Sequence, residues 1–238
     1  MKFRSIWPAV ILTALLGACS TAPTRPSRTP SPAAPSGFLQ DYSLLAPDPH
    51  DPGYQRYVAP GIEFQRYRKF MVDDPVFIVN TGNAYTSVDP ARLRAISDYY
   101  KSRMAVALGR HYQVADAPGP GVARLRTAVV GLVQVRAQFK VRDLIPVKAM
   151  FDAARMVAGK SPQVLRMSIE GELLDSESGK LLGETIDSRE SRQTVAGASA
   201  PPSNDQIHEL IDFWVSRFVA RLDRANGYPA DPDGHSGM

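Results

Sequence analysis

The sequence predicts an α+β protein with a mainly antiparallel sheet, two long amphipathic helices packed on one face of that sheet, and a short extra helix. Apolar residues recur at helical spacing in two long segments, one after Pro90 and one after Ser203. They alternate with polar residues over 165–192, which is the pattern of a β-hairpin. A shorter helical pattern at 146–158 accounts for the extra helix.

The N-terminal part of the folded body is expected to supply strands. The body begins near Gly37 with apolar residues that need a surface to cover, namely Phe38, Leu39, Tyr42 and Leu44. A loop-rich stretch with two prolines follows at 48–53. Residues 62–72 and 75–80 are predicted strands, because their apolar residues alternate or form a short run. Within the first of these, residues 65–70 mix basic and aromatic side chains, which favours an edge strand with cationic positions in solvent.

The first long helix and a long strand come next. Ser87 or Asp89 can cap the helix, and Pro90 suits its first turn. Its apolar residues recur at helical spacing: Leu93, Ile96, Tyr100, Met104 and Leu108. After short strand material at 112–115, a turn at 118–121 leads into a strand predicted over 122–138.

The hairpin and the last helix complete the predicted body. One face of the first hairpin strand carries Leu165, Met167, Ile169 and Leu173, and the other carries Arg166, Ser168, Glu170 and Glu172. A polar turn with Gly179 leads to a returning strand at 181–192. Ser203 or Asn204 caps the last helix, whose apolar stripe should pack on the sheet: Ile207, Leu210, Ile211, Trp214, Phe218 and Leu222.

The charge balance argues against a nucleic-acid partner. The chain has a net charge of +4, with 28 basic and 24 acidic side chains. Two of the basic residues, Lys2 and Arg4, lie in a segment expected to be removed, and that segment contains no acidic residue. The mature chain then has a net charge of only +2, whereas nucleic-acid binding requires a concentrated basic face.

The N-terminus has the pattern of a secretory signal. A basic start precedes an apolar run over 6–16, and the small residues Gly17 and Ala18 stand before Cys19. The run is too short for a spanning helix, which needs ~20 residues. The signal is therefore expected to be cleaved rather than to remain as the anchor.

Leu16, Gly17, Ala18 and Cys19 resemble the bacterial lipobox. By that resemblance the signal is cleaved between Ala18 and Cys19, and Cys19 carries fatty acyl chains such as palmitate on its sulfur and its new amino group. Several chains hold a protein to a bilayer durably, whereas a single chain holds it only marginally. The alternative is cleavage by the general peptidase, which would leave Cys19 as an ordinary thiol. Ser20 then resembles the outer-membrane default, because an Asp at this position favours retention at the inner membrane.

The chain is predicted to have four parts. Residues 1–18 form the lipoprotein signal peptide, and 19–36, rich in Pro, Ser and Thr, form a semi-extended tether. Residues 37–226 form a single α+β domain, and 227–238 form a disordered tail. The predicted location is the outer membrane, facing the periplasm.

Four groups of residues together resemble a family of bacterial lipoproteins defined as domain of unknown function 3313. They are Ser36-Gly37-Phe38-Leu39 with Asp41-Tyr42-Ser43, Asp74-Pro75-Val76, Gly119-Pro120-Gly121 leading to Leu125-Arg126, and Gly171-Glu172-Leu173-Leu174-Asp175 with Gly179. The resemblance spans 36–226 and departs from the family at 71–74, which hold one extra acidic residue. It implies an exported lipoprotein of unknown biochemical role and supplies no catalytic residue.

The sequence contains no recognisable catalytic, cofactor or metal site. Gly159-Lys160-Ser161 lacks the earlier glycine of a phosphate-binding loop, and the histidines lack metal-site spacing. Glu170 and Glu172 share a strand face, where two carboxylates could act as acid and base. Because this face is opposite the apolar one, both are predicted to be solvent-exposed. The helix at 146–158 either packs in the core or offers its apolar face to a partner.

The leading functional hypothesis is a non-enzymatic binding or accessory module of the cell envelope. Its expected partners are the membrane, through the N-terminal lipid, and an envelope protein, with no cofactor and no metal. Two alternatives remain. One is an envelope hydrolase that uses Glu170 and Glu172, and the other is a carrier of an apolar ligand held between sheet and helix.

Overall fold

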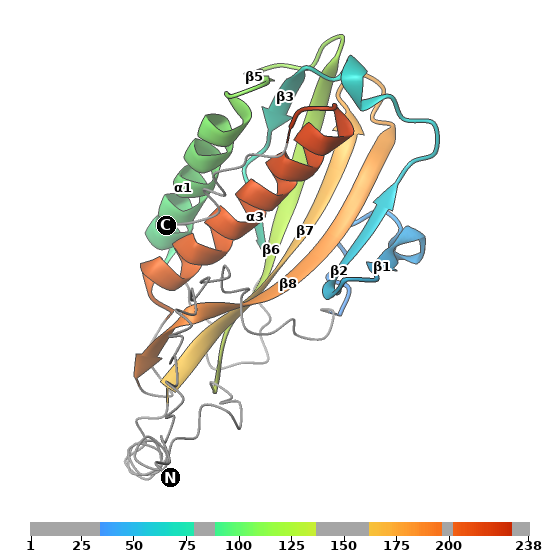
Figure 1. The fold of residues 1–238 in the computed structure, drawn as a ribbon. Helices are drawn as coiled ribbons and strands as arrows, with labels where there is room; N and C mark the ends of the chain where they lie inside the picture. The colour runs from blue at the N-terminus through green and yellow to red at the C-terminus, as the bar shows by residue number, and fades with distance from the viewer. Residues whose placement is uncertain (1–33, 79–88, 137–161, 197–201, 230–238) are drawn as a thin grey trace, which may run out of the picture.

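A twisted sheet with two long helices on one face forms the body of the protein (Figure 1). The computed structural model describes residues 34–78, 89–136, 162–196 and 202–229. The predicted α+β class, with a mostly antiparallel sheet and two packed helices, is confirmed. The predicted helix at 146–158 and the lipobox lie outside the described residues.

The sheet has eight strands within the described part of the chain, in the order β1-β2-β8-β7-β6-β3-β5, with β4 paired to β6. The strands are β1 (Ala46–Asp48), β2 (Asp51–Val58), β3 (Lys69–Val72), β4 (Val76–Ile78), β5 (Gln113–Val114), β6 (Val122–Arg136), β7 (Pro162–Asp175) and β8 (Leu181–Ala196). The neighbouring strands β1, β2, β8, β7 and β6 are paired in antiparallel orientation, in that order across the sheet. Strands β3 and β4 pair with β6 in parallel, as β3 does with β5.

The helices are α1 (Pro90–Leu108) and α3 (Asn204–Ala225). Asp89 caps α1 by accepting a hydrogen bond from the Ala91 N–H, and Ser203 caps α3 in a capping box with Gln206. The predicted apolar faces are largely buried, including Ile96, Tyr100, Met104 and Leu108 of α1. Tyr99 and Arg103 of α1 both bind Asp212 of α3, at 3.0 and 2.6 Å. The two helices therefore form one layer over the sheet (Figure 1).

The first strands differ from the sequence prediction. Strand β2, which was not predicted, pairs with β8 through residues 54–58. The close approach of these strands requires a glycine, because a Cβ at Gly183 would lie 2.9 Å from the Tyr57 carbonyl oxygen. Residues 64–66 form a 3₁₀ turn, η2 (Phe64–Arg66), instead of a strand. Strand β3 is also not an edge strand, because β5 and β6 pair with its two sides.

The packed body extends beyond both predicted limits. Ser36, assigned above to the tether, contacts Glu170 of β7. Tyr228, assigned above to the tail, stacks on His111 with ring centroids 4.2 Å apart and accepts a hydrogen bond of 2.7 Å from Arg68. Among the described residues, no helix combines the length and the apolar character needed to cross a bilayer.

Candidate functional site

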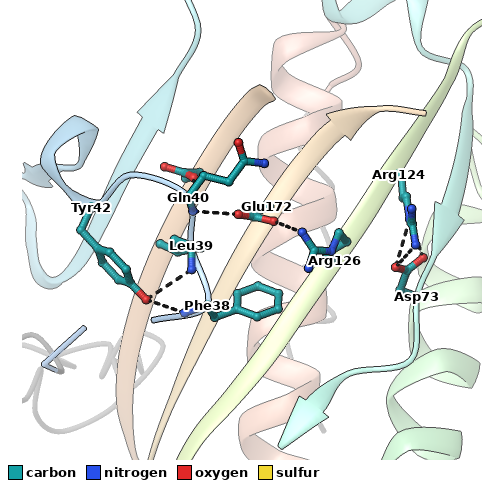
Figure 2. Close-up of polar contacts among 9 residues, drawn as sticks. Phe38, Leu39, Gln40, Tyr42, Asp73, Arg124, Arg126 and Glu172 are labelled. Atoms are coloured by element: carbon teal, nitrogen blue, oxygen red, sulfur yellow. Dashed lines mark hydrogen bonds and ion pairs between the residues drawn. The ribbon is translucent and has the colours of Figure 1, made fainter. Parts of the chain in front are cut away.

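The face of the sheet opposite the helices is crossed by residues 36–44, here called the N-terminal strap (Figure 2). The strap ends in the 3₁₀ turn η1 (Tyr42–Leu44), which Asp41 caps by accepting a 2.9 Å hydrogen bond from the Ser43 N–H. Leu39 is only 5% exposed. The prediction that the apolar residues after Gly37 cover a surface is therefore confirmed at Leu39.

The prediction that Glu170 and Glu172 face solvent is wrong. Both lie on the face opposite the helices, as their alternation indicates, but both side chains are 0% exposed. The strap covers this face, and it comes from a part of the chain more than 125 residues away. A buried carboxylate is stable only when ion pairs or hydrogen bonds replace its water shell.

Glu170 is held by Ser36 and Tyr42 of the strap. Its Oε2 atom accepts hydrogen bonds from the Tyr42 hydroxyl at 2.6 Å and from the Ser36 hydroxyl at 2.7 Å. The Tyr42 oxygen in turn accepts hydrogen bonds from the backbone N–H groups of Gly37 and Phe38, at 2.9 and 3.0 Å. The Tyr42 hydroxyl therefore connects the strap backbone to the central strand β7.

Glu172 is held by one backbone group and one cation (Figure 2). Its Oε1 atom accepts a 3.0 Å hydrogen bond from the Gln40 N–H, and its Oε2 atom lies 2.6 Å from Nη1 of Arg126. The Arg126 guanidinium also lies over the Phe38 ring, 5.2 Å from its centroid. The Glu172 carboxylate is fully buried, but the Arg126 side chain is 37% exposed, so solvent screens this ion pair from one side. The strap is attached to the β6–β7 ion pair through the Gln40 N–H and the Phe38 ring.

Glu184 of β8 is the third acidic residue under the strap. It is 3% exposed, and its Oε1 atom accepts a 3.2 Å hydrogen bond from the same Gln40 N–H. Burial raises the pKa of Glu184, backbone N–H groups at Asp41 and Gln40 lower it, and the negative charge of Glu172 raises it further. The net shift of this pKa is upward, because burial is the largest of these effects.

A second polar cluster lies on the helix side of the sheet. Asp51 of β2 lies 2.6 Å from a guanidinium nitrogen of Arg189 and 2.6 Å from one of Arg217. Asp187 lies 2.6 Å from Arg189 and 3.5 Å from Arg217. These four residues connect β2, β8 and α3. They resemble a structural ion network, because each carboxylate is matched by two guanidiniums.

The two carboxylates of this network have opposite pKa shifts. Burial would raise the pKa of Asp51, but the hydrogen bonds and charges of Arg189 and Arg217 outweigh it and lower that pKa to about 2. Asp187 is more deeply buried, and burial raises its pKa to about 6 despite the same two arginines. Asp187 is therefore the acidic residue whose charge depends on pH in the physiological range.

The three histidines of the described residues have different neighbours. His111 lies 3.1 Å from Asp223, and His208 stacks on Tyr99. His50 is in an exposed turn. Within the described ranges, no three residues of His, Cys, Asp or Glu are grouped as a metal site. Gly159-Lys160-Ser161 lies outside these ranges.

A family model described as "Protein of unknown function (DUF3313)" matches residues 34–218 of the chain. The chain belongs to this family. The matched region of this DUF3313 protein starts just before the strap and ends within α3, so it includes the strap, the three glutamates beneath it and the four residues of the ion network.

The DUF3313 chain is also similar to the uncharacterized lipoprotein YdcL of Escherichia coli strain K12. The two are 24% identical over 199 residues, which are 83% of this chain and 86% of the relative. The chain is a lipoprotein of a family of unknown function, and its similarity to lipoproteins implies that it is exported and lipid-anchored.

Two solved lipoprotein structures also align with this DUF3313 chain. A minor lipoprotein from Acinetobacter baumannii is 12% identical with a TM-score of 0.33, covering 69% of this chain and 98% of that one. Lipoprotein GNA1162 from Neisseria meningitidis is 14% identical with a TM-score of 0.32, covering 66% of this chain and 98% of that one.

Three of the residue groups that carry the family resemblance meet at the strap. Ser36 to Leu39 with Tyr42, Arg126, and Glu172 are distant in sequence but in direct contact in the structure. Asp73, the residue before the fourth group, forms a two-pronged ion pair with Arg124 at 2.7–3.0 Å (Figure 2). In this chain, residues that carry the family resemblance thus make part of the fastening of the strap.

Sequence reasoning missed the pairing of strap and carboxylates, although signals for each were present. The apolar residues after Gly37 indicated a segment that covers a surface, and Glu170 and Glu172 indicated a polar sheet face. Nothing in the alternation indicates that these two surfaces bind each other, because periodicity describes only local structure.

Tyr42→Phe should loosen the strap, because Glu170 loses its shortest hydrogen bond and the backbone N–H groups of residues 36–39 lose the hydroxyl oxygen that each approaches within 3.3 Å. The expected loss in the free energy of unfolding is about 1–3 kcal/mol. Hydrogen exchange at Gly37 and Phe38 should accelerate. Tyr57→Phe is the matched control, because the Tyr57 hydroxyl forms no hydrogen bond with a described residue. Unchanged exchange in Tyr42→Phe would contradict the role of this hydroxyl.

Asp187→Asn should change how stability depends on pH. The pKa of Asp187 is about 6 in the folded chain against 3.8 for the free side chain, so the folded state holds this proton more tightly. The wild type therefore loses stability as pH rises from about 4 through about 6, by roughly 3 kcal/mol. The variant should lack this loss, and urea unfolding between these pH values measures it. Asp98→Asn, at an exposed site on α1, is the control; parallel curves for wild type and Asp187→Asn would refute the assignment.

Proposed function

We propose that this lipoprotein is a non-enzymatic binding or accessory module of the cell envelope, anchored through Cys19 in the outer membrane and facing the periplasm. The observation that carries the proposal is the burial of Glu170 and Glu172. The two carboxylates available for acid and base chemistry are committed to the strap and to Arg126. A structural role for them favours a tethered binding module over a hydrolase.

The position of the strap supports a tethering role. Sixteen residues, from Ser20 to Pro35, separate the proposed lipid site at Cys19 from Ser36, the first strap residue to contact β7. A force along the tether would therefore reach the body at the hydrogen bonds of Glu170. Buried, charge-assisted hydrogen bonds are among the strongest side-chain contacts, so this is an effective place to attach an anchor.

The carrier alternative is less well supported. A cavity between the sheet and the helices has a volume of about 70 Å³. Sites that enclose a drug-sized ligand are typically about 300–1,000 Å³. A long acyl chain would need a much larger space than this cavity offers.

Cys19→Ser should remove the protein from the outer-membrane fraction, because the variant has no sulfur to acylate. Density-gradient separation of the envelope, with mass spectrometry of the mature N-terminus, measures both location and acylation. Ser20→Asp is the matched variant. It should keep the acyl chains but shift the protein to the inner-membrane fraction. An unmodified Cys19 in the wild type would overturn the anchoring proposal.

The accessory role predicts crosslinks to envelope components and no hydrolysis of peptidoglycan or phospholipid by the purified protein. Crosslinking in the intact envelope, followed by mass spectrometry, identifies the neighbours. Recovery of nothing above the background of an unrelated outer-membrane lipoprotein would count against the role. Hydrolysis that disappears in both Glu170→Gln and Glu172→Gln, but persists in Glu177→Gln at the exposed hairpin turn, would establish the hydrolase alternative instead.

A further inference from the structure

The small cavity between the sheet and α3 has a specific structural origin. Three side-by-side positions on the central strands, Thr127, Gly171 and Thr185, face the helices and line it. Gly171 has no side chain and its neighbours are threonines, so the sheet fills less space here than it does at Ile169 or Leu173. The cavity is partly open to solvent.

The walls of the cavity are mainly apolar. Met104, Ile169, Val215 and Phe218 contribute to them. The polar atoms of the neighbouring lining residues are buried within the walls, including the Thr127 hydroxyl and the Trp214 indole nitrogen. The cavity therefore favours a small apolar group. At about 70 Å³ it holds only a few heavy atoms, because a cavity of about 150 Å³ is needed to hold benzene.

One side of the cavity is cationic. Arg217 and Arg221 of α3 both line it, together with Tyr54 of β2. The Arg221 guanidinium carbon lies 3.6 Å from the centre of the Tyr54 ring, and that of Arg217 lies 4.5 Å from it. The ring occupies one face of each guanidinium, while N–H groups at a guanidinium edge can still donate hydrogen bonds.

The charges around this rim do not balance. The negative charges come from two carboxylates, those of Asp51 and Asp187. The positive charges come from the guanidiniums of four arginines, which are Arg189, Arg217, Arg221 and the nearby exposed Arg56. The rim therefore has a surplus of two positive charges. Arg189 and Arg217 are ion-paired to both carboxylates. Arg221 forms no ion pair with any carboxylate of the described residues, although it is half-buried.

A half-buried guanidinium that forms no ion pair with a described carboxylate is a favourable partner for an anion. Burial lowers the pKa of Arg221 to about 10, and the positive charges of Arg217 and Arg56 add to this lowering, whereas Tyr54 and the negative charge of Asp187 oppose it. A bound anion would offset both effects. A carboxylate suits this position best, because its two oxygens match the fork of guanidinium N–H groups.

We propose that the cavity and the guanidinium of Arg221 form a binding site for a small carboxylate carried on a short alkyl chain. The alkyl chain would occupy the apolar cavity, and the carboxylate would contact Arg221 at the rim. The surplus positive charge disfavours cations, and the cavity volume excludes long acyl chains. The inference does not rest on the proposed tethering role, so either can fail alone.

Ligand-observed saturation-transfer NMR can test this with the full mature lipoprotein in lipid nanodiscs, using empty nanodiscs as the blank. Butanoate should bind with a millimolar Kd. Butanamide, the neutral analogue of nearly the same shape, should bind at least about tenfold more weakly, because it lacks the charge-assisted hydrogen bonds. From acetate to butanoate, each methylene should strengthen binding by about fourfold, because it is buried in the cavity.

Arg221→Gln should weaken butanoate binding by at least about tenfold. Arg224→Gln, at an exposed site one turn further along α3, is the matched control and should change the Kd by less than about twofold. No saturation by butanoate below about 100 mM would overturn the proposal. Equal affinity for butanoate and butanamide, no dependence on chain length, or wild-type affinity in Arg221→Gln would each overturn it too. The comparison of butanoate with butanamide and the comparison of chain lengths both use the native protein. These two tests therefore remain valid even if the Arg221→Gln variant folds poorly.

Discussion

The structure depends on two buried carboxylates of β7, Glu170 and Glu172, whose hydrogen-bond partners come from the N-terminal strap. A buried carboxylate is stable only when hydrogen bonds or an ion pair replace its water shell. Glu172 obtains these from the Gln40 N–H and from Arg126, and Glu170 obtains its partners from Tyr42 and Ser36. The strap is therefore an integral layer of the domain, even though it directly follows the segment that leads to the predicted lipid site.

Alternation along β7 gives adjacent residues separate roles. Glu172 points to the strap, whereas Gly171 faces the helices and leaves the space that becomes the cavity. The two sites are on opposite sides of one sheet and share no side chain. A substitution at either residue therefore acts on one face first, and the backbone of β7 is the physical connection between them.

The parts of the fold that depend on local pattern could be predicted from the sequence. The caps at Asp89 and Ser203 and the apolar faces of α1 and α3 follow from side-chain chemistry and helical spacing. Strand β2 could not be predicted in this way, because its helix-facing side carries Tyr54 and Arg56 rather than an apolar row, and its pairing with β8 is a distant contact. The burial of Glu170 was missed for the same reason, since its partners are 128 and 134 residues away. The sequence indicated that Leu39 packs against a surface, but it did not indicate which surface that is.

The length of the loop that the strap closes also affects how the domain assembles. The ribosome makes the strap first, and its partners on β7 emerge more than 120 residues later. Contacts this distant form late and slow the search for the native topology. The strap, like the pairing of β2 with β8, is therefore expected to form late, and until it does Glu170 and Glu172 face water.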